Sequence, residues 1–219
     1  MFGKLFLSAV FFVVLFFPEN IGVDKLSHRY VWVGMISAEH LKHCKQAFFD
    51  DPTLRAIEYR ASPGASADAK RIGAEIEALI DMRRLSTFAR GQCGSACAVA
   101  FLLGHERVLL ASLDQVPTHL FIHVPRNSLT KEMNYGHADR DFKKIVARSG
   151  NRFPLSLLEM TYEVKTPEGG LYILRQAVAS KENGGLHHVW FCAGDELITQ
   201  QSCQPVVGVT PQDLGIAIE

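Results

Sequence analysis

The sequence has no excess of charge of either sign, since 23 lysine and arginine residues balance 23 aspartate and glutamate residues. The lack of a basic excess argues against nucleic acid as a partner, and the lack of an acidic excess argues against a disordered chain. The chain also has no internal repeat and no long low-complexity linker. Its 219 residues suit one domain with a sizeable core, which we place at residues 23–219.

Cysteine is scarce, and its spacing excludes the common metal sites. The sequence has neither a C-x-x-C pair nor a zinc-type His–Cys spacing, so we expect no metal and no other cofactor. Four cysteines are candidates for disulfides, and buried thiols are the alternative: Cys93, Cys97, Cys192 and Cys203. Cys44 makes the total of five odd, so at least one cysteine stays unpaired or pairs elsewhere.

Long hydrophobic runs are absent except at the N-terminus. Lys4 precedes an apolar run from Leu5 to Phe17, which is typical of a signal peptide. The run is shorter than the about 20 residues that a membrane-spanning helix needs. Because no A-x-A cleavage site follows, residues 1–22 fit both a cleaved signal peptide and an uncleaved anchor. We therefore predict an exported, periplasmic chain that contacts the inner membrane only through this segment, if it is uncleaved.

Apolar runs and turn signals alternate along the rest of the chain, which predicts an α/β fold with parallel strands. Strands are expected at residues 30–36, 54–59, 85–89, 107–111 and 119–123. Helices are expected at residues 39–48, 66–82, 95–103, 129–148 and 154–162, the second with Ser66 as its N-cap. In the tail we expect a hairpin from residues 187–192 and 196–200, and a short helix opened by Pro211.

Two turns between a strand and a helix carry small residues that expose the backbone. In S-P-G-A-S, Gly64 and Ala65 leave backbone N–H groups open to an oxyanion, although this motif alone favours an ordinary strand-to-helix turn. In G-Q-C-G-S-A-C, Ser95 lies between Gly94 and Ala96 at a helix start, which resembles a nucleophile elbow. An ordinary N-cap serine is the alternative, and a cysteine nucleophile is a further rival.

A histidine suited to general-base chemistry ends an apolar strand. His123 stands in F-I-H-V-P, and histidine is the usual base for a serine hydroxyl. A buried or edge histidine without a role in catalysis is the alternative, because the chain has nine histidines.

These motifs, in this order, resemble the proteolytic subunit of the Clp protease, with S-P-G-G-S, G-x-A-A-S-M and I-H-x-P. The similarity is closer to a group of exported Clp-like proteins with C-G-S-A-C-x-x-A-F-x-x-G, matched by residues 93–104. It covers residues 30–125 well and the remainder weakly. The resemblance implies the ClpP/crotonase-like fold, a repeated ββα spiral, with Ser95 as nucleophile, His123 as base and an oxyanion hole at Gly64, Ala65 and Ala96.

The chain departs from the family pattern at two places. Ala65 replaces the second glycine of the oxyanion turn, and the acidic member of the triad has no clear counterpart. Glu168 is the nearest candidate, so a Ser–His dyad, a triad completed by another acid and a degenerate enzyme all stay open.

The resemblance implies an exported serine peptidase that acts on a peptide or protein substrate. A non-catalytic binding or assembly module on the same fold is the alternative, whereas export disfavours acyl-CoA chemistry. Because relatives form rings, we also expect a homo-oligomer. The charged segment at residues 131–148 then reads as a solvated or oligomer-facing helix.

Overall fold

The computed structural model describes residues 22–65, 68–127, 130, 132–181, 184–194 and 203–219. The predicted signal or anchor segment therefore lies, up to residue 21, outside the described residues. Within the described ranges, no helix is both long enough and apolar enough to cross a membrane.

The described strands form one ten-stranded sheet of mixed direction. Its order is β1-β2-β3-β4-β6-β7-β8-β9, while β5 pairs with β4 and β10 pairs with β5. The strands are β1 Gly22–Asp24, β2 Arg29–Val33, β3 Ala56–Ser62, β4 Ser86–Gly94, β5 Arg107–Leu109, β6 His119–Ile122, β7 Gly170–Ala179, β8 Leu186–Cys192, β9 Cys203–Pro205 and β10 Ala217–Ile218. Strands β2, β3, β4 and β6 run parallel, as predicted, whereas β7, β8 and β9 continue the sheet antiparallel.

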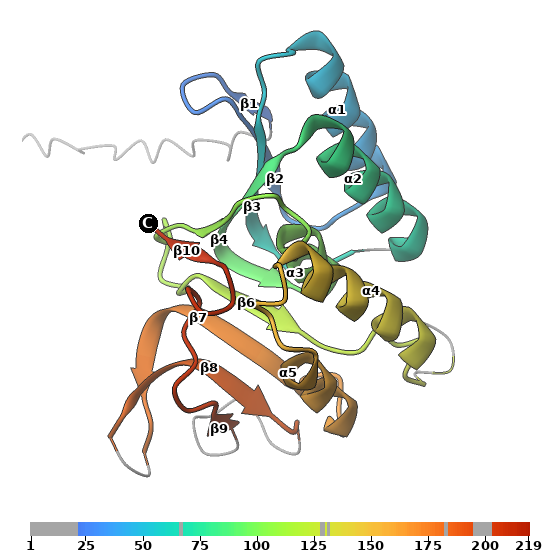
Figure 1. Ribbon diagram of the computed structural model, residues 1–219. Coiled ribbons are helices and arrows are strands. Elements are labelled where there is room, and N and C mark those ends of the chain that lie inside the picture. Colours follow the sequence, from blue (N-terminus) through green and yellow to red (C-terminus); the bar gives the residue numbers. More distant parts are fainter. Residues whose placement is uncertain (1–21, 66–67, 128–129, 131, 182–183, 195–202) are drawn as a thin grey trace, which may run out of the picture.

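The helices lie together along one face of this sheet (Figure 1). They are α1 Ala38–Asp50, α2 Ala69–Arg83, α3 Ala96–Leu102, α4 Tyr135–Arg148 and α5 Leu155–Glu159, followed by the 3-10 turn η1 Met160–Glu163. The apolar stripe predicted for α2 is buried, from Ile72 to Ile80. The α/β class is thus confirmed.

Alternation along β2 and β3 explains which face the helices cover. Tyr30 and Trp32 on β2 and Tyr59 on β3 are almost fully buried. Trp32 meets Tyr30 edge-on and Tyr59 at a tilt, and the rings of Tyr30 and Trp32 also contact Phe48 and His40 of α1. Successive strand residues point to opposite faces of a sheet, so their neighbours lie on the uncovered face.

The uncovered face holds a buried carboxylate among cations. Glu58 on β3 is 1 % exposed, and its carboxylate lies 3.2 Å from Arg29, 2.7 Å from Arg60 and 3.0 Å from Arg90. Burial alone would raise the pKa of Glu58, but the hydrogen bonds from Arg60 and Arg90 hold that pKa below its ordinary value. Glu58 therefore joins three strands through charge.

Several expected boundaries are wrong, and the reasons are local. Helix α2 begins at Ala69, with Asp68 in the N-cap position, while Ser66 lies outside the described residues. Helix α4 begins only at Tyr135, because the Asn134 side chain accepts a hydrogen bond from the backbone N–H of His137, 3.0 Å away.

The tail differs most from expectation. Pro211 opens a turn rather than a helix, and the chain then enters β10 beside β5. Strand β8 agrees with the expected hairpin strand, but residues 196–200 lie outside the described residues and β9 pairs with β8 instead. The long strand β7 was not expected.

Candidate active site

Ser95 stands alone between a strand and a helix. Strand β4 ends at Gly94 and α3 begins at Ala96, so Ser95 takes the connecting position with φ +54° and ψ −123°. Residues other than glycine rarely adopt such angles, and they mark strain at functional positions. The Ser95 side chain makes no capping hydrogen bond, so the ordinary N-cap reading does not describe it. Its backbone N–H donates to the Phe121 carbonyl at 2.8 Å, which fixes the turn to β6.

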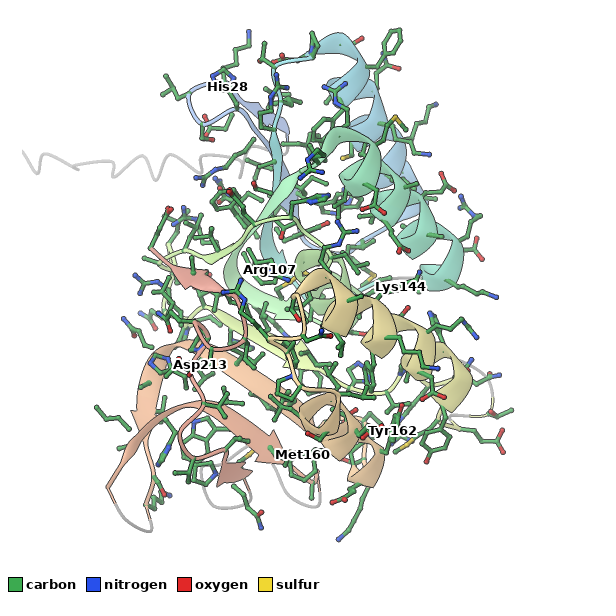
Figure 2. The ribbon with its side chains drawn as sticks, viewed as in Figure 1. His28, Arg107, Lys144, Met160, Tyr162 and Asp213 are labelled. Atoms are coloured by element: carbon green, nitrogen blue, oxygen red, sulfur yellow. A yellow bond between two sulfur atoms is a disulfide. The ribbon has the colours of Figure 1, made fainter. Side chains whose placement is uncertain are left out.

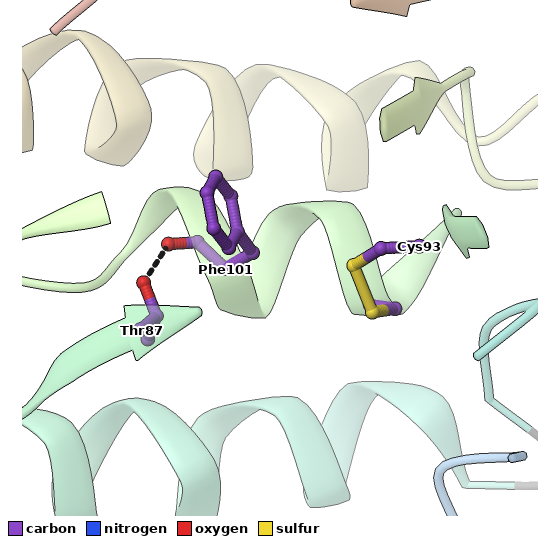
Figure 3. The surroundings of a disulfide bond; sticks show 4 residues. Thr87, Cys93 and Phe101 are labelled. Atoms are coloured by element: carbon purple, nitrogen blue, oxygen red, sulfur yellow. Dashed lines mark hydrogen bonds between the residues drawn. A yellow bond between two sulfur atoms is a disulfide. The ribbon is translucent and has the colours of Figure 1, made fainter. Parts of the chain in front are cut away.

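A disulfide joins the residues on either side of Ser95. Cys93 near the end of β4 is bonded to Cys97 in the first turn of α3 (Figure 3). Both cysteines are completely buried. At the other end of α3, the Thr87 hydroxyl donates to the Phe101 carbonyl at 2.6 Å, so the helix is held against β4 at both ends.

A second disulfide lies far along the sheet, where Cys192 on β8 is bonded to Cys203 on β9. The four predicted disulfide cysteines therefore form two bonds, which is compatible with an oxidising compartment. Cys44 keeps a free thiol in the core, and burial raises its pKa well above the ordinary range. That thiol is unsuited to nucleophilic attack, because only the thiolate is reactive.

The turn after β3 presses its backbone against Ser95. Gly64 has φ +131°, and a β-carbon placed on it would lie 2.9 Å from the Ser95 β-carbon and 3.2 Å from the Gly94 carbonyl oxygen. The Gly64 carbonyl accepts from the Ile36 N–H at 2.8 Å. Neither Gly64 nor Ala65 donates its N–H to an acceptor among the described residues. The turn thus holds free donors beside the serine, and only glycine fits its closest point.

His123 follows directly after β6, with its ring held on two sides. Its Nδ1 lies 3.0 Å from the Val124 carbonyl oxygen, which assigns the proton to Nδ1 and leaves Nε2 as the acceptor. The ring stacks on Phe121, with centroids 5.0 Å apart, and Phe121 stacks in turn on Tyr172. Burial lowers the pKa of His123, and the Arg126 charge lowers it further against the opposing Val124 bond. His123 is therefore a neutral base near pH 7.

Ser95, Ala96 and His123 line one cavity of about 180 Å³ between the sheet ends and the helices. Its other lining residues come from α2, α3, α4 and the segment after β6: Ala69, Lys70, Gly73, Ala74, Glu77, Val99, Ala100, Leu103, Pro125, His137, Arg140, Asp141 and Lys144. No hydrogen bond joins Ser95 to His123 within the described chain. Such catalytic bonds are often long without substrate and tighten when substrate binds.

Helix α4 contributes charged side chains to the cavity, although the sequence predicts that this helix faces solvent or another subunit. His137 Nε2 lies 3.3 Å from Asp141 Oδ2. Lys144, which is labelled on α4 in Figure 2, donates from Nζ to Glu77 Oε2 on α2 at 2.5 Å. Burial raises the pKa of Asp141, while the His137 charge opposes the shift. The i,i+4 spacing of His137 and Asp141 on one helix face was the available signal for this pair.

Glu168 does not meet His123. Its side chain is exposed, and a hydrogen bond from Thr166 lowers the pKa of its carboxyl. No hydrogen bond or ion pair joins Glu168 to His123 among the residues that the structure describes. The Nδ1 position that a triad acid would occupy already donates to Val124. The structure therefore brings together Ser95 and His123 without this acid.

No protein-family model matches the chain, and no curated protein matches it. Its family and its activity therefore stay proposals, supported by the residues around the cavity.

Proposed function

We propose that this chain is an exported serine hydrolase of ClpP/crotonase-like fold that cleaves peptide bonds with Ser95 and His123. One observation carries the proposal. An uncapped serine in a strained turn and a histidine whose Nδ1 is already engaged line the same cavity. An ordinary structural serine at a helix start would cap the helix.

The fold and the compartment are parts of the same proposal. Parallel strands β2, β3, β4 and β6 with helices on one face suit the spiral of that superfamily. The signal-like residues 1–22 and the two disulfides suit export. A homo-oligomer stays a prediction, to be checked by sedimentation equilibrium.

The proposed reaction has two half-steps. The Ser95 Oγ forms a bond to the acyl carbon while His123 Nε2 takes its proton, and the carbonyl electron pair moves to oxygen. Backbone N–H groups at Gly64, Ala65 and Ala96 meet this oxyanion. When the oxyanion collapses, the C–N bond breaks and the amine leaves with the proton from His123. Water then repeats the sequence on the acyl-serine and releases the acid.

A second candidate is a binding or assembly module that retains the cavity without catalysis. It is favoured by one observation: in the described chain His123 has neither an acid partner nor a hydrogen bond to Ser95. A neutral carbonyl stabilises the imidazolium less than a carboxylate does.

Labelling by a fluorophosphonate probe distinguishes the two candidates. We expect the oxidised protein without its N-terminal segment to be labelled, and Ser95→Ala to abolish labelling. Ser86→Ala is the matched control, because Ser86 lies at the opposite end of β4. A folded, oxidised protein that takes no label, or a label that persists in Ser95→Ala, would overturn the hydrolase and favour the binding module.

A further inference from the structure

We propose that the Cys93–Cys97 disulfide positions Ser95 for attack, so that hydrolysis depends on the oxidation of this pair. The inference rests on the proposed function and adds its regulation: the chain gains activity only in a compartment that forms disulfides. Cys93 and Cys97 are positioning residues here, since they act through Ser95 and touch no substrate.

The covalent ring around Ser95 is small. Between Cys93 and Cys97 the chain contains only Gly94, Ser95 and Ala96, so the bond fixes the two flanks of the strained residue relative to each other. A residue other than glycine keeps such angles only when its surroundings over-determine them. The disulfide supplies this restraint at the point where β4 turns into α3.

The other restraints on Ser95 are weaker or more distant. Its N–H donates to Phe121 at 2.8 Å, but its side chain makes no cap bond. The Thr87 bond to Phe101 holds α3 at the end away from Ser95 (Figure 3). Without the disulfide, the first turn of α3 is free to move, and Ser95 can relax toward ordinary helical angles. The Ser95 hydroxyl would then leave its place beside Gly64.

Burial determines how this dependence operates. Cys93 and Cys97 are both 0 % exposed, so a dissolved thiol cannot reach the bond in the folded protein. The bond therefore forms during oxidative folding and acts as a permanent clamp. In forming it, the two thiols lose two protons and two electrons to a disulfide oxidant, which is released as two thiols.

The second disulfide offers a matched control within the same chain. Cys192–Cys203 joins β8 to β9, and no residue of either strand lines the cavity. Removing it tests the general effect of losing a disulfide without touching the elbow. The test compares Cys93→Ala/Cys97→Ala with Cys192→Ala/Cys203→Ala for probe labelling rate and thermal midpoint.

We expect the first double variant to lose at least about 100-fold in labelling rate, because displacements near 1 Å cost this much. We expect the second to stay within about twofold, even where its midpoint falls. Labelling of the first variant within about threefold of the unmodified protein would overturn the proposal. The proposal would also be overturned if, in both double variants, the labelling rate fell in the same proportion to the loss in thermal midpoint.

A readout independent of activity separates this inference from the proposed function. Amide hydrogen exchange at Ser95 should become at least about tenfold faster in the first variant only, because its bond to Phe121 loosens. An unmodified protein that takes no label refutes the hydrolase, whereas unchanged exchange in the first variant refutes the clamp.

If Cys93→Ala/Cys97→Ala does not fold, the same question can be tested by comparing the reduced and the oxidised form of the Cys93–Cys97 pair. In Cys192→Ala/Cys203→Ala, the remaining disulfide is Cys93–Cys97, since Cys44 is free and buried. Refolding with a thiol reductant gives the dithiol, and refolding with oxidised glutathione gives the disulfide. We expect labelling only in the oxidised sample, and equal labelling in both folded samples would overturn the proposal.

Discussion

Replacing Gly64 by alanine tests whether its backbone is built against the nucleophile. The new methyl group would lie 2.9 Å from the Ser95 β-carbon, 3.2 Å from the Gly94 carbonyl oxygen and 3.5 Å from the Ser95 Oγ. The first two contacts are too short unless the backbone moves, and hydrogen bonds hold the backbone on both sides. The Gly64 carbonyl is bonded to Ile36, and Gly94 ends a central strand. The methyl group and Ser95 must therefore move apart.

The expected cost has two parts. An alanine at φ +131° leaves the regions that L-residues populate, which costs roughly 1–3 kcal/mol. Overpacking against Ser95 adds about 1–3 kcal/mol. We expect Gly64→Ala to lower the free energy of unfolding by about 2–6 kcal/mol. Because the proposed oxyanion donor at Gly64 would be displaced, labelling of Ser95 in the folded fraction should fall by roughly 10²–10³-fold.

Urea unfolding and the second-order rate of fluorophosphonate labelling measure the two effects separately. Gly34→Ala is the control, because Gly34 has φ +74° with no atom within 4 Å of the new methyl group. Gly34→Ala should lower the free energy of unfolding by about 1–2 kcal/mol because of its positive φ alone, without a steric clash. If Gly64→Ala labelled within about threefold of the unmodified protein and lost no more stability than Gly34→Ala, the close approach to Ser95 would be refuted.

Four further predictions follow from the charged groups. Because burial lowers the pKa of His123, the labelling rate should rise with pH and reach half of its maximum below about pH 6.5. A half-maximal rate at or above pH 7 would contradict this. The unfolded chain binds the His123 proton at a higher pH than the folded chain does, so the free energy of unfolding should fall as the pH drops below about 6.5. In urea titrations, His123→Gln should remove the part of this fall that is due to His123. Glu168→Gln should leave the labelling rate within about twofold, and a tenfold loss would restore Glu168 as a triad member. Glu58→Gln should cost roughly 2–4 kcal/mol in urea unfolding, because three arginines lose their common anion, and a loss below about 0.5 kcal/mol would show that Arg60 and Arg90 are solvated instead.

Local patterns predicted the first half of the fold because each element there is decided by its own residues. The β-rich run around Trp32 is buried as three consecutive residues, and the helical stripe around Ile76 buries one helix face, whatever their partners are. Strand β7 lacked such a signal. Its pattern changes from buried to exposed along its length, and Gly170 is needed where a β-carbon would collide with the Ile122 carbonyl oxygen. That constraint exists only once β6 lies beside it.

Some residues of the candidate site could be predicted from the sequence, and others could not. Ser95, His123 and Gly64 lie at ends of neighbouring strands, so strand order alone brings them to one sheet edge. Asp141 and His137 come from a helix that crosses above this edge, and their part in the cavity depends on the docking of α4 against α2. The spacing of Ala138, Phe142 and Ile145 indicates that α4 buries one face, but it does not show which helix lies opposite the charged side chains.

Among the described residues no acid contacts His123, and this is consistent with the rest of the site. A buried imidazole whose Nδ1 faces a neutral carbonyl is neutral near pH 7, so it accepts a proton readily but holds the resulting charge poorly. On the proposed mechanism, such a pair would gain its rate from geometry instead of from stabilisation of the imidazolium. The strained turn at Ser95, the clamp between Cys93 and Cys97 and the close approach of Gly64 all fix geometry. A site organised in this way should lose more activity from a small displacement of Ser95 than from any change of charge around the cavity.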